Sequence, residues 1–271
     1  MRRKRAYARH ASSGRSASRV TAEGVRVGKL RCTERPYGSP ALSCSTRTER
    51  VMRVGILGSG LMGGKLGTIF ARAGHEVVFS YARSGKKLDK LARAAGAGAR
   101  AGTPREAAAG ANALLLAVHW LRFDDVLGQA GDLAGKIVIS CSLPMNEENT
   151  ELVVGRSSSA AEELAKKLPK SRIVSAFNTV PSEVLFGVYE SRRRKNRPSL
   201  VYCGDNAGGK RVAAGLIRDV GFEPLDVGPL RMARYTEPFA LLVAQIAYEG
   251  PKGPEVAYRF DWSEKRQREA R

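Results

Sequence analysis

The chain has 271 residues, of which 43% are hydrophobic, enough for one large domain or for one domain with a smaller second part. Its formal net charge of +20 comes from 46 Lys and Arg residues against 26 Asp and Glu residues. Residues 1–50 hold 13 of the basic and 3 of the acidic residues, and the run Arg192–Arg197 holds five more basic residues. Because this charge is local rather than spread over a face, nucleic-acid binding is not expected.

The sequence also gives no sign of a membrane span or a metal site. No apolar stretch reaches about 18 residues, the length that a membrane helix needs. The four cysteines, Cys32, Cys44, Cys141 and Cys203, have no metal-ligand spacing. Cys141 and Cys203 stand in apolar runs, so we expect them to be reduced core residues.

Residues 1–51 are predicted to be a disordered basic extension outside the fold. They are rich in Arg, Ser, Gly and Ala and have no periodic apolar face. Three interpretations stay open: a disordered tail, an extension ahead of a true start at Met52, or an organelle transit peptide. No apolar stretch follows "MRRKR", so a secretory signal is not expected, and a cytoplasmic location is predicted.

From residue 51 onward, predicted strands alternate with predicted helices. Strands are expected at 51–58, 75–81, 111–118, 135–142, 171–177 and 198–204, with a short one in "FEPLDVG". Helices are expected at 61–73, 88–95, 122–130, 157–168, 206–220 and 235–248. This alternation predicts an α/β fold, a Rossmann-type doubly wound parallel sheet. Ligands of such sheets bind at the carboxyl ends of the strands.

The first strand runs into the glycine-rich turn "GSGLMG". In this pattern Gly58 would make the tight turn, Gly60 would let a pyrophosphate approach the backbone, and Gly63 would let the following helix pack closely. The amide groups at the start of that helix would face the anion. The pattern follows a strand and opens a helix, as a dinucleotide site requires, so it predicts one.

The second predicted strand ends in "SYARSGKK" rather than in an acidic residue. An acid there would bond the adenosine ribose and repel a 2′-phosphate. Ser80 can instead donate a hydrogen bond, Arg83 can fork onto phosphate, and Lys86 or Lys87 adds positive charge. The sequence therefore favours NADP over NAD; the alternative is a solvated basic loop that opens a helix.

Five segments together resemble a known family. They are "MRVGILGSGLMGGKLGTIFARAGHEVVFSYARS", "LLLAVHW", "ELVVGRSSSAAEELAKKLP", "SAFNTVPSEVL" and "CGDN…GFEPLDVGPLRMARYTEP". This ordered set resembles the coenzyme F420-dependent NADP oxidoreductases, also called NADPH-dependent F420 reductases, over about residues 52–250. The resemblance implies an NADP-binding Rossmann domain at 52–177 and a C-terminal substrate-covering part at 178–250. Residues 251–271, rich in charged side chains, are predicted from the sequence itself to be a charged, loosely ordered tail.

The resemblance also implies which residues contact NADP(H). Around the glycine-rich turn and the end of the second strand these are Gly58, Ser59, Gly60, Leu61, Met62, Gly63, Ser80, Arg83 and Lys87. After the third predicted strand they are Ala117, Val118 and His119, where the family often has Pro in place of His119. Coenzyme F420 is implied as the co-substrate, and the resemblance is compatible with a homodimer.

Hydride transfer between a nicotinamide and a deazaflavin needs alignment and exclusion of water more than catalytic side chains. In "AFNTVP", Asn178 can bond a carboxamide or a ring carbonyl, and Thr179 can donate its hydroxyl; the alternative for Asn178 is a turn-forming bond. His119 could supply a proton or cap a helix. We predict these three residues as the catalytic set.

Three functions stay open. The first is hydride transfer between NADPH and F420. The second is an NADPH-dependent flavin or ferric reductase, and the third is a non-catalytic NADP-binding sensor. If F420 is the partner, its acidic tail could be held by the basic loop Arg192–Arg197, which is otherwise a solvated surface loop. A small-molecule redox substrate is expected in the first two cases, with no nucleic-acid or membrane partner.

Overall fold

A computed structural model describes residues 51–96 and 98–262. Eight strands form one sheet in the order β3-β2-β1-β4-β5-β6-β7-β8, and every neighbouring pair is parallel except β6 and β7. The strands are β1 Arg53–Leu57, β2 Glu76–Ser80, β3 Ala99–Ala101, β4 Ala113–Leu116, β5 Ile137–Ser140, β6 Arg172–Ser175, β7 Ser199–Gly204 and β8 Glu223–Asp226. The predicted Rossmann-type α/β fold is confirmed.

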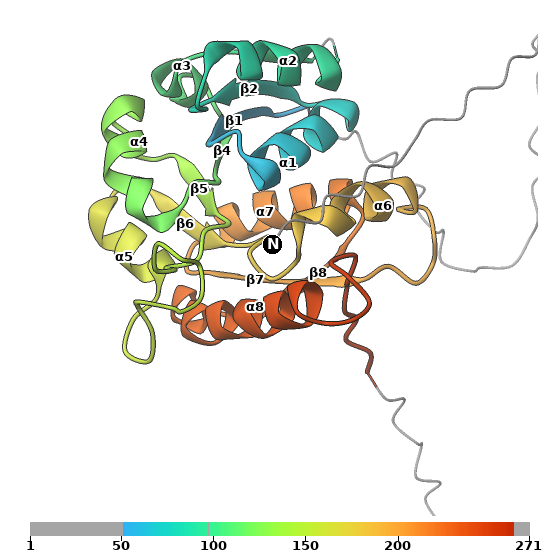
Figure 1. The fold of residues 1–271 in the computed structure, drawn as a ribbon. Helices are drawn as coiled ribbons and strands as arrows, with labels where there is room; N and C mark the ends of the chain where they lie inside the picture. The colour runs from blue at the N-terminus through green and yellow to red at the C-terminus, as the bar shows by residue number, and fades with distance from the viewer. Residues whose placement is uncertain (1–50, 97, 263–271) are drawn as a thin grey trace, which may run out of the picture. The chain divides into compact units, whose positions relative to one another are not determined.

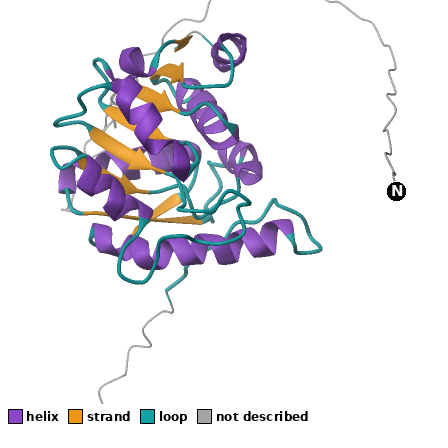
Figure 2. Cartoon of the chain, turned by 60° about the vertical axis from the view of Figure 1, so that its left-hand side comes forward, coloured by secondary structure: helices purple, strands orange, loops and turns teal. Residues whose placement is uncertain are grey.

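Helices cover both faces of this sheet (Figures 1 and 2). They are α1 Leu61–Arg72, α2 Gly85–Ala95, α3 Pro104–Ala108, α4 Phe123–Ala130, α5 Ala160–Lys167, α6 Leu185–Glu190, α7 Ala207–Val220 and α8 Ala233–Tyr248. Three 3₁₀ turns, η1 Trp120–Arg122, η2 Ser182–Val184 and η3 Leu230–Met232, each lead into a helix. Helices α1, α2, α6 and α7 pack on one face, and α3, α4, α5 and α8 on the other.

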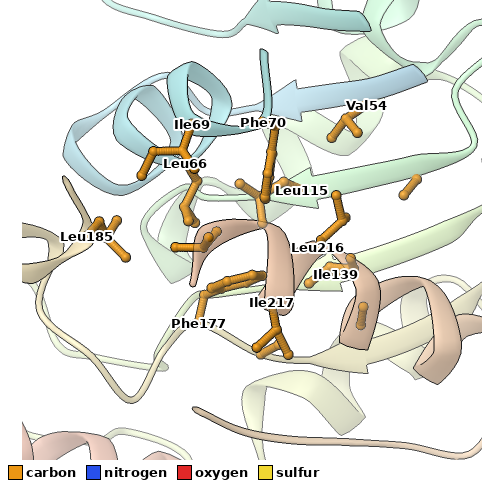
Figure 3. Packing of buried hydrophobic residues seen from close by; sticks show 14 of the residues in the cluster. Val54, Leu66, Ile69, Phe70, Leu115, Ile139, Phe177, Leu185, Leu216 and Ile217 are labelled. Carbon is orange, nitrogen blue, oxygen red and sulfur yellow. The ribbon is translucent and has the colours of Figure 1, made fainter. Parts of the chain in front are cut away.

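The larger hydrophobic core lies between the sheet and the α1 and α7 helices (Figure 3). Leu66, Ile69 and Phe70 repeat at helical spacing, so α1 presents one apolar side to the sheet. Phe70 meets Phe177 edge to face, with ring centroids 6.2 Å apart. This contact joins α1 to the loop after β6, which belongs to the site described below.

The structure contains elements that the sequence did not lead us to predict. β3 has three residues, "ARA", with no β-branched side chain, so the usual strand signal is absent. α3 does have a local signal that we overlooked: Thr103 and Glu106 form a capping box around Pro104. The strand β7 pairs with β6 in the antiparallel direction. The alternation of strands and helices in the sequence does not specify this direction, because it depends on the tertiary structure.

Part of the predicted loose tail at 251–271 is instead packed against the fold. The Tyr258 ring lies 5.0 Å from that of Phe239 on α8, and its hydroxyl bonds Thr179 at 2.7 Å. The Ser199 amide donates to the Tyr258 carbonyl, which anchors this segment along β7. The expectation of loose order is therefore wrong for this part of the segment.

The predictions for residues 1–50, which include Cys32 and Cys44, fall outside the described residues. Within 51–96 and 98–262, no helix is long and apolar enough to cross a membrane. Over the same described ranges, no cluster of three or more His, Cys, Asp or Glu side chains could hold a metal ion.

Candidate functional site

The glycine-rich turn between β1 and α1 has the geometry that its sequence predicts. Gly58 has φ +110°, and a Cβ there would lie 2.5 Å from the Ala117 carbonyl oxygen. A Cβ on Gly63 would lie 1.9 Å from the Gly58 carbonyl oxygen, so only glycine lets α1 start this close to the turn. A Cβ on Gly60 would meet no atom within 4 Å. The backbone at Gly60 thus borders open space, where a pyrophosphate could approach.

The start of α1 supplies hydrogen-bond donors to that space. No side chain caps the helix at Gly60, and its first turn carries no acidic residue. The first amide N–H groups of a helix lack partners within the helix and attract anions. Leu61, 72% exposed, and the half-buried Met62 follow directly. The turn can therefore bind a diphosphate through its backbone.

Ser59 is fully buried and holds the turn against the end of β2. Its hydroxyl donates to the Ser80 carbonyl oxygen at 2.8 Å, and its amide donates to the Tyr81 carbonyl oxygen at 3.1 Å. The side chain of Ser59 is thus a support for the turn rather than a contact for a ligand. The same bonds fix the end of β2, where the predicted phosphate grip begins.

Ser80 does not offer its hydroxyl to that grip. It is fully buried, and its Oγ donates to the Ile56 carbonyl oxygen at 2.7 Å. The exposed hydroxyl at this corner belongs to Ser84, the N-cap residue of α2, which makes no side-chain capping bond. Sequence reasoning missed it, although Ser immediately before a helix is a frequent N-cap. Arg83, Lys86 and Lys87 are exposed around the same helix start.

Tyr81 fixes the direction in which the chain leaves β2. Its φ of 55° is unusual for a bulky side chain, and its hydroxyl bonds the Asp125 carboxylate of α4. Burial, with the bond to Asp125 as the next cause, raises the pKa of Tyr81 to about 12. The phenol therefore stays protonated, and it ties the basic corner to α4.

A second part of the site is a cavity of about 320 Å³ beside the glycine-rich turn. Its walls come from five segments far apart in the sequence: the start of α1, the loops after β4, β5 and β6, and helix α8. The lining residues include Leu61, Met62, Ala117, Val118, His119, Cys141, Ser142, Leu143, Asn178, Pro181, Ser182, Ala240, Val243, Ala244 and Tyr248. All but one of these segments follow a strand, so the cavity lies at the carboxyl edge of the sheet, where ligands of this fold bind.

His119 lines this cavity and carries a buried hydrogen-bond donor. Its Nδ1 accepts the Leu121 amide at 3.3 Å, so in the neutral ring the proton resides on Nε2. Nε2 is buried and has no partner. His119 was predicted either to cap a helix or to supply a proton. The structure shows that it caps η1. Because Nε2–H has no partner, donation to a bound ring is chemically available as well.

Asn178 lines the same cavity and carries a buried acceptor. It is 8% exposed; its Nδ2 donates to Ser175 Oγ at 3.3 Å, while Oδ1 is buried without a partner. The preceding Phe177 has φ 66° and is fully buried. A bulky residue in this conformation costs about 1–3 kcal/mol and persists where the surroundings fix it. This strained backbone fixes the position of Asn178.

Thr179 does not contribute its hydroxyl to the cavity. It is fully buried, its Oγ1 is bonded to Tyr258, and it is not a lining residue. The predicted ring-holding hydroxyl is thus used in the core, because the turn at 177–180 directs Thr179 toward Tyr258. Asn178 and Thr179 are consecutive, and only the former faces the site.

The loops after β4 and β5 close the cavity together. Ser142 Oγ donates to the Val118 carbonyl oxygen at 2.7 Å, which joins the two loops. Cys141 lines the cavity, and burial raises the pKa of its thiol to about 12, so the thiol is an uncharged wall. Cys203 is buried in β7, and both cysteines are free, as expected.

Comparison with known proteins finds similar sequences. Residues 53–144 match the family described as NADP oxidoreductase coenzyme F420-dependent. The metalloreductase STEAP3 of Rattus norvegicus is 31% identical over 189 residues, which are 70% of this chain and 36% of that protein. The chain thus spans about a third of the length of this relative.

Solved structures share the fold. A protein of Arthrobacter sp. FB24 proposed to be an F420-dependent NADP-reductase matches 78% of this chain and all of its own, with TM-score 0.67 and 21% identity. The hypothetical protein SMa0349 of Sinorhizobium meliloti matches 78% of this chain and 97% of its own, with TM-score 0.61 and 23% identity. A reductive aminase of Aspergillus terreus in complex with NADPH matches 72% of this chain and 61% of its own, with TM-score 0.53 and 18% identity. The match to the coenzyme F420-dependent NADP oxidoreductase family thus covers residues 53–144, the part of the chain that holds the glycine-rich turn.

Proposed function

We propose that this protein transfers hydride between NADPH and the deazaflavin coenzyme F420. The observation that carries the proposal is the cavity beside the glycine-rich turn: two residues that line it, His119 and Asn178, each hold a buried polar atom without a partner, Nε2 and Oδ1 respectively. An unpaired buried polar group costs about 1–3 kcal/mol, so a pair of them at one cavity favours a polar ring as the occupant.

The residues at the other end suit NADP. The Gly58–Gly63 turn and the first amides of α1 would hold the diphosphate, because Gly60 borders open space and α1 is uncapped there. Arg83 with Lys86 or Lys87 would hold the 2′-phosphate, and Ser84 would add a hydroxyl. We assign this last contact to Ser84 rather than to Ser80.

At the ring end, NADPH supplies the hydride, and the protein aligns the two rings. Asn178 Oδ1 would accept from a carboxamide N–H, and His119 Nε2–H would donate to a ring oxygen or nitrogen. Apolar side chains such as Val118, Leu143 and Val243 would exclude water from the reacting carbons. That α8 supplies one wall supports the proposed division into an NADP-binding domain at 52–177 and a substrate-covering part at 178–250.

The basic loop offers a place for the acidic tail of F420. A hollow of about 440 Å³ contains Arg194, and the next hollow along the loop contains Arg193 as well. The first hollow is linked to the ring cavity by one hydrogen bond: Tyr248, which lines the cavity, donates to Glu183, which lines the hollow, at 3.1 Å. Arg192 is engaged elsewhere: its guanidinium bonds the Tyr189 carbonyl oxygen at 2.8 Å. Of the basic residues in the loop, we therefore propose only Arg193 and Arg194 as contacts for the acidic tail of F420.

The testing experiment is steady-state absorbance with the full chain, with NADPH or NADH as donor and F420 or FMN as acceptor. We expect F420 to be bleached with NADPH and far more slowly with NADH. Reaction with FMN but not with F420 would contradict the proposal. Binding of NADPH without turnover on either acceptor would favour the sensor function.

The second candidate is an NADPH-dependent flavin or ferric reductase. It is favoured by one observation, the 31% identity with a metalloreductase over 189 residues. A flavin presents the same flat tricyclic shape as a deazaflavin, so the cavity does not separate the two. Including FMN with ferric citrate in the same assay distinguishes them, since only this candidate predicts ferric reduction.

A further inference from the structure

The C-terminal segment 251–262 follows α8 and returns to the sheet. None of its residues lines the ring cavity. It nevertheless contacts the start of β7 and the loop after β6, which is the loop that carries Asn178. The segment therefore lies where it can hold one wall of the cavity from behind.

The backbone ladder between β6 and β7 is short. The two strands form two residue pairs, the last of them between Ser175 and Cys203, where β6 ends. Because the strands are antiparallel, the start of β7 lies beyond the end of β6. Ser199 and Val201 are buried at this start, and buried backbone amides require acceptors. These acceptors come from the C-terminal segment.

Tyr258 supplies both acceptors. Its carbonyl oxygen accepts the Ser199 amide at 2.8 Å, and its hydroxyl oxygen accepts the Val201 amide at 3.3 Å. The Ser199 hydroxyl in turn accepts the Phe260 amide at 3.0 Å. The Tyr258 ring meets those of Phe239 on α8 and Phe260 edge to face, with centroids 5.0 and 5.6 Å away. Tyr258 is thus fixed through both its backbone and its side chain.

The same hydroxyl also holds the loop after β6. It is bonded to Thr179 Oγ1 at 2.7 Å. Because Thr179 is fully buried, loss of this bond would leave a polar group in the core unpaired. On the other side of Asn178, Phe177 is fully buried and meets Phe70 of α1 edge to face. Asn178 is therefore held from both sides, through Phe177 in the core and through Thr179 on Tyr258.

We propose that Tyr258 is a positioning residue, whose hydroxyl ties the loop after β6 to β7 and thereby keeps Asn178 in the wall of the ring cavity. The φ of 66° at Phe177 is unfavourable for a bulky residue, so the loop keeps this conformation only while neighbouring contacts fix it. The bond between Thr179 and Tyr258 is one of these contacts. Without it, Asn178 loses its fixed position and hydride transfer slows. The glycine-rich turn lies outside these contacts and binds NADPH as before.

This inference rests on the proposed function for the reaction that Asn178 serves, but its first test does not. Hydrogen exchange of the full chain would be followed in peptides that cover residues 176–181, with peptides of α4 as the internal reference. Tyr258→Phe keeps the ring and removes the hydroxyl, so it is expected to raise exchange at 176–181 relative to α4 by roughly threefold or more. Thr179→Val, which removes the hydroxyl on the other side of the bond, should do the same.

Tyr202→Phe is the matched control, because Tyr202 is a buried tyrosine of β7 that does not line the ring cavity. Its exchange at 176–181 should equal that of the wild type. Equal exchange in the wild type, Tyr258→Phe and Thr179→Val would overturn the proposal. Thr179→Val decides the question if Tyr258→Phe does not fold, because it leaves the bonds of Tyr258 to β7 intact.

The second test is a double-mutant cycle in activity with NADPH and F420. Tyr258→Phe is expected to lower kcat/KM by about threefold to tenfold, through kcat, and to leave the NADPH Kd within about twofold of the wild type. In the Asn178→Ala background the same substitution should have no further effect, because the group that it positions is gone. A loss that persists in that background would overturn the proposal, since Tyr258 would then act by another route.

Failure of this inference and failure of the proposed function give different results. If the chain reduces no F420, the proposed function fails, and the exchange test alone decides whether Tyr258 holds the loop. An active enzyme in which Tyr258→Phe keeps the kcat/KM of the wild type would sink this inference and leave the proposed function intact.

Discussion

The two ends of the site are built in different ways. The phosphate end lies within a single βαβ unit, Gly58 to Lys87, and consists of backbone amides and exposed cations. The ring end gathers side chains from position 61 to position 248 of the chain, and two of its polar atoms are buried. A site built from one local unit can be predicted from sequence. A site built from five distant segments is specified only when the whole fold is present.

The two ends also differ in how much their polar groups destabilise the folded protein when no ligand is bound. Exposed groups at the phosphate end are satisfied by water. At the ring end, His119 Nε2 and Asn178 Oδ1 are buried without partners, and each costs about 1–3 kcal/mol. Substitutions of exposed side chains at the phosphate end should therefore affect binding alone. Substitutions of the unpaired polar groups at the ring end should change binding and stability in opposite directions.

The largest expected effect is from Gly63→Ala. Its Cβ would overlap the Gly58 carbonyl oxygen at 1.9 Å, and backbone cannot yield as a side chain can. We expect the free energy of unfolding to fall by at least about 3 kcal/mol, measured by urea denaturation. This substitution at the phosphate end would therefore destabilise the fold as well as weaken binding.

Gly60→Ala is the control for that substitution, because its Cβ meets nothing within 4 Å and its φ of −75° suits alanine. The free energy of unfolding should change by less than about 1 kcal/mol. The NADPH Kd should rise roughly tenfold, because the methyl group occupies the approach of the diphosphate. Unchanged NADPH affinity would argue against a diphosphate at this turn.

The next largest effect is expected from Arg83→Gln. A charge-assisted hydrogen bond is worth about 1.5–3 kcal/mol, so the NADPH Kd should rise by about tenfold or more while the NADH Kd stays the same. Isothermal titration at low and high salt measures both. Arg93→Gln, the same change at an exposed position near the end of α2, should alter neither. If the substitution weakened the binding of NADPH and NADH equally, Arg83 would not contact the 2′-phosphate.

Much of the fold and the phosphate end was predictable because their signals are local. The β1 strand, the glycine spacing and the basic corner all lie within 35 residues. Ser80 shows the limit of local signals. Its position at the end of the strand was predicted correctly. Its hydroxyl, however, donates to the Ile56 carbonyl oxygen, because its side chain is buried. Sequence does not say which of two nearby serines, Ser80 or Ser84, keeps a free hydroxyl.

At the ring end, residue type was predictable and orientation was not. "AFNTVP" marked Asn178 and Thr179 equally, yet the latter bonds Tyr258, a residue expected in a loose tail. The wall from α8 had no sequence signal as a cavity lining, since Ala240 and Val243 look like ordinary core residues. Their role depends on contacts between segments that lie far apart in the sequence.

Asn178→Ala is expected to separate binding from stability. Removing the unpaired Oδ1 should leave the free energy of unfolding unchanged or slightly raised, while kcat/KM falls roughly tenfold, equivalent to about 1.4 kcal/mol. Asn112→Ala gives the opposite pattern, because Asn112 Oδ1 already accepts the Arg53 amide at 2.8 Å; it should lose stability and keep activity. Loss of stability in Asn178→Ala would show that its amide serves the fold.

The smallest effect is expected from the double substitution Arg193→Gln with Arg194→Gln. Exposed charges attract a polyanion weakly and are screened by salt, so the KM for F420 should rise about three- to tenfold at low salt and little at physiological salt. The NADPH Kd should not change. Arg211→Gln, an exposed charge on α7, is the matched control. An unchanged KM at low salt would leave the loop as a solvated surface, and it would confine substrate recognition to the buried ring end.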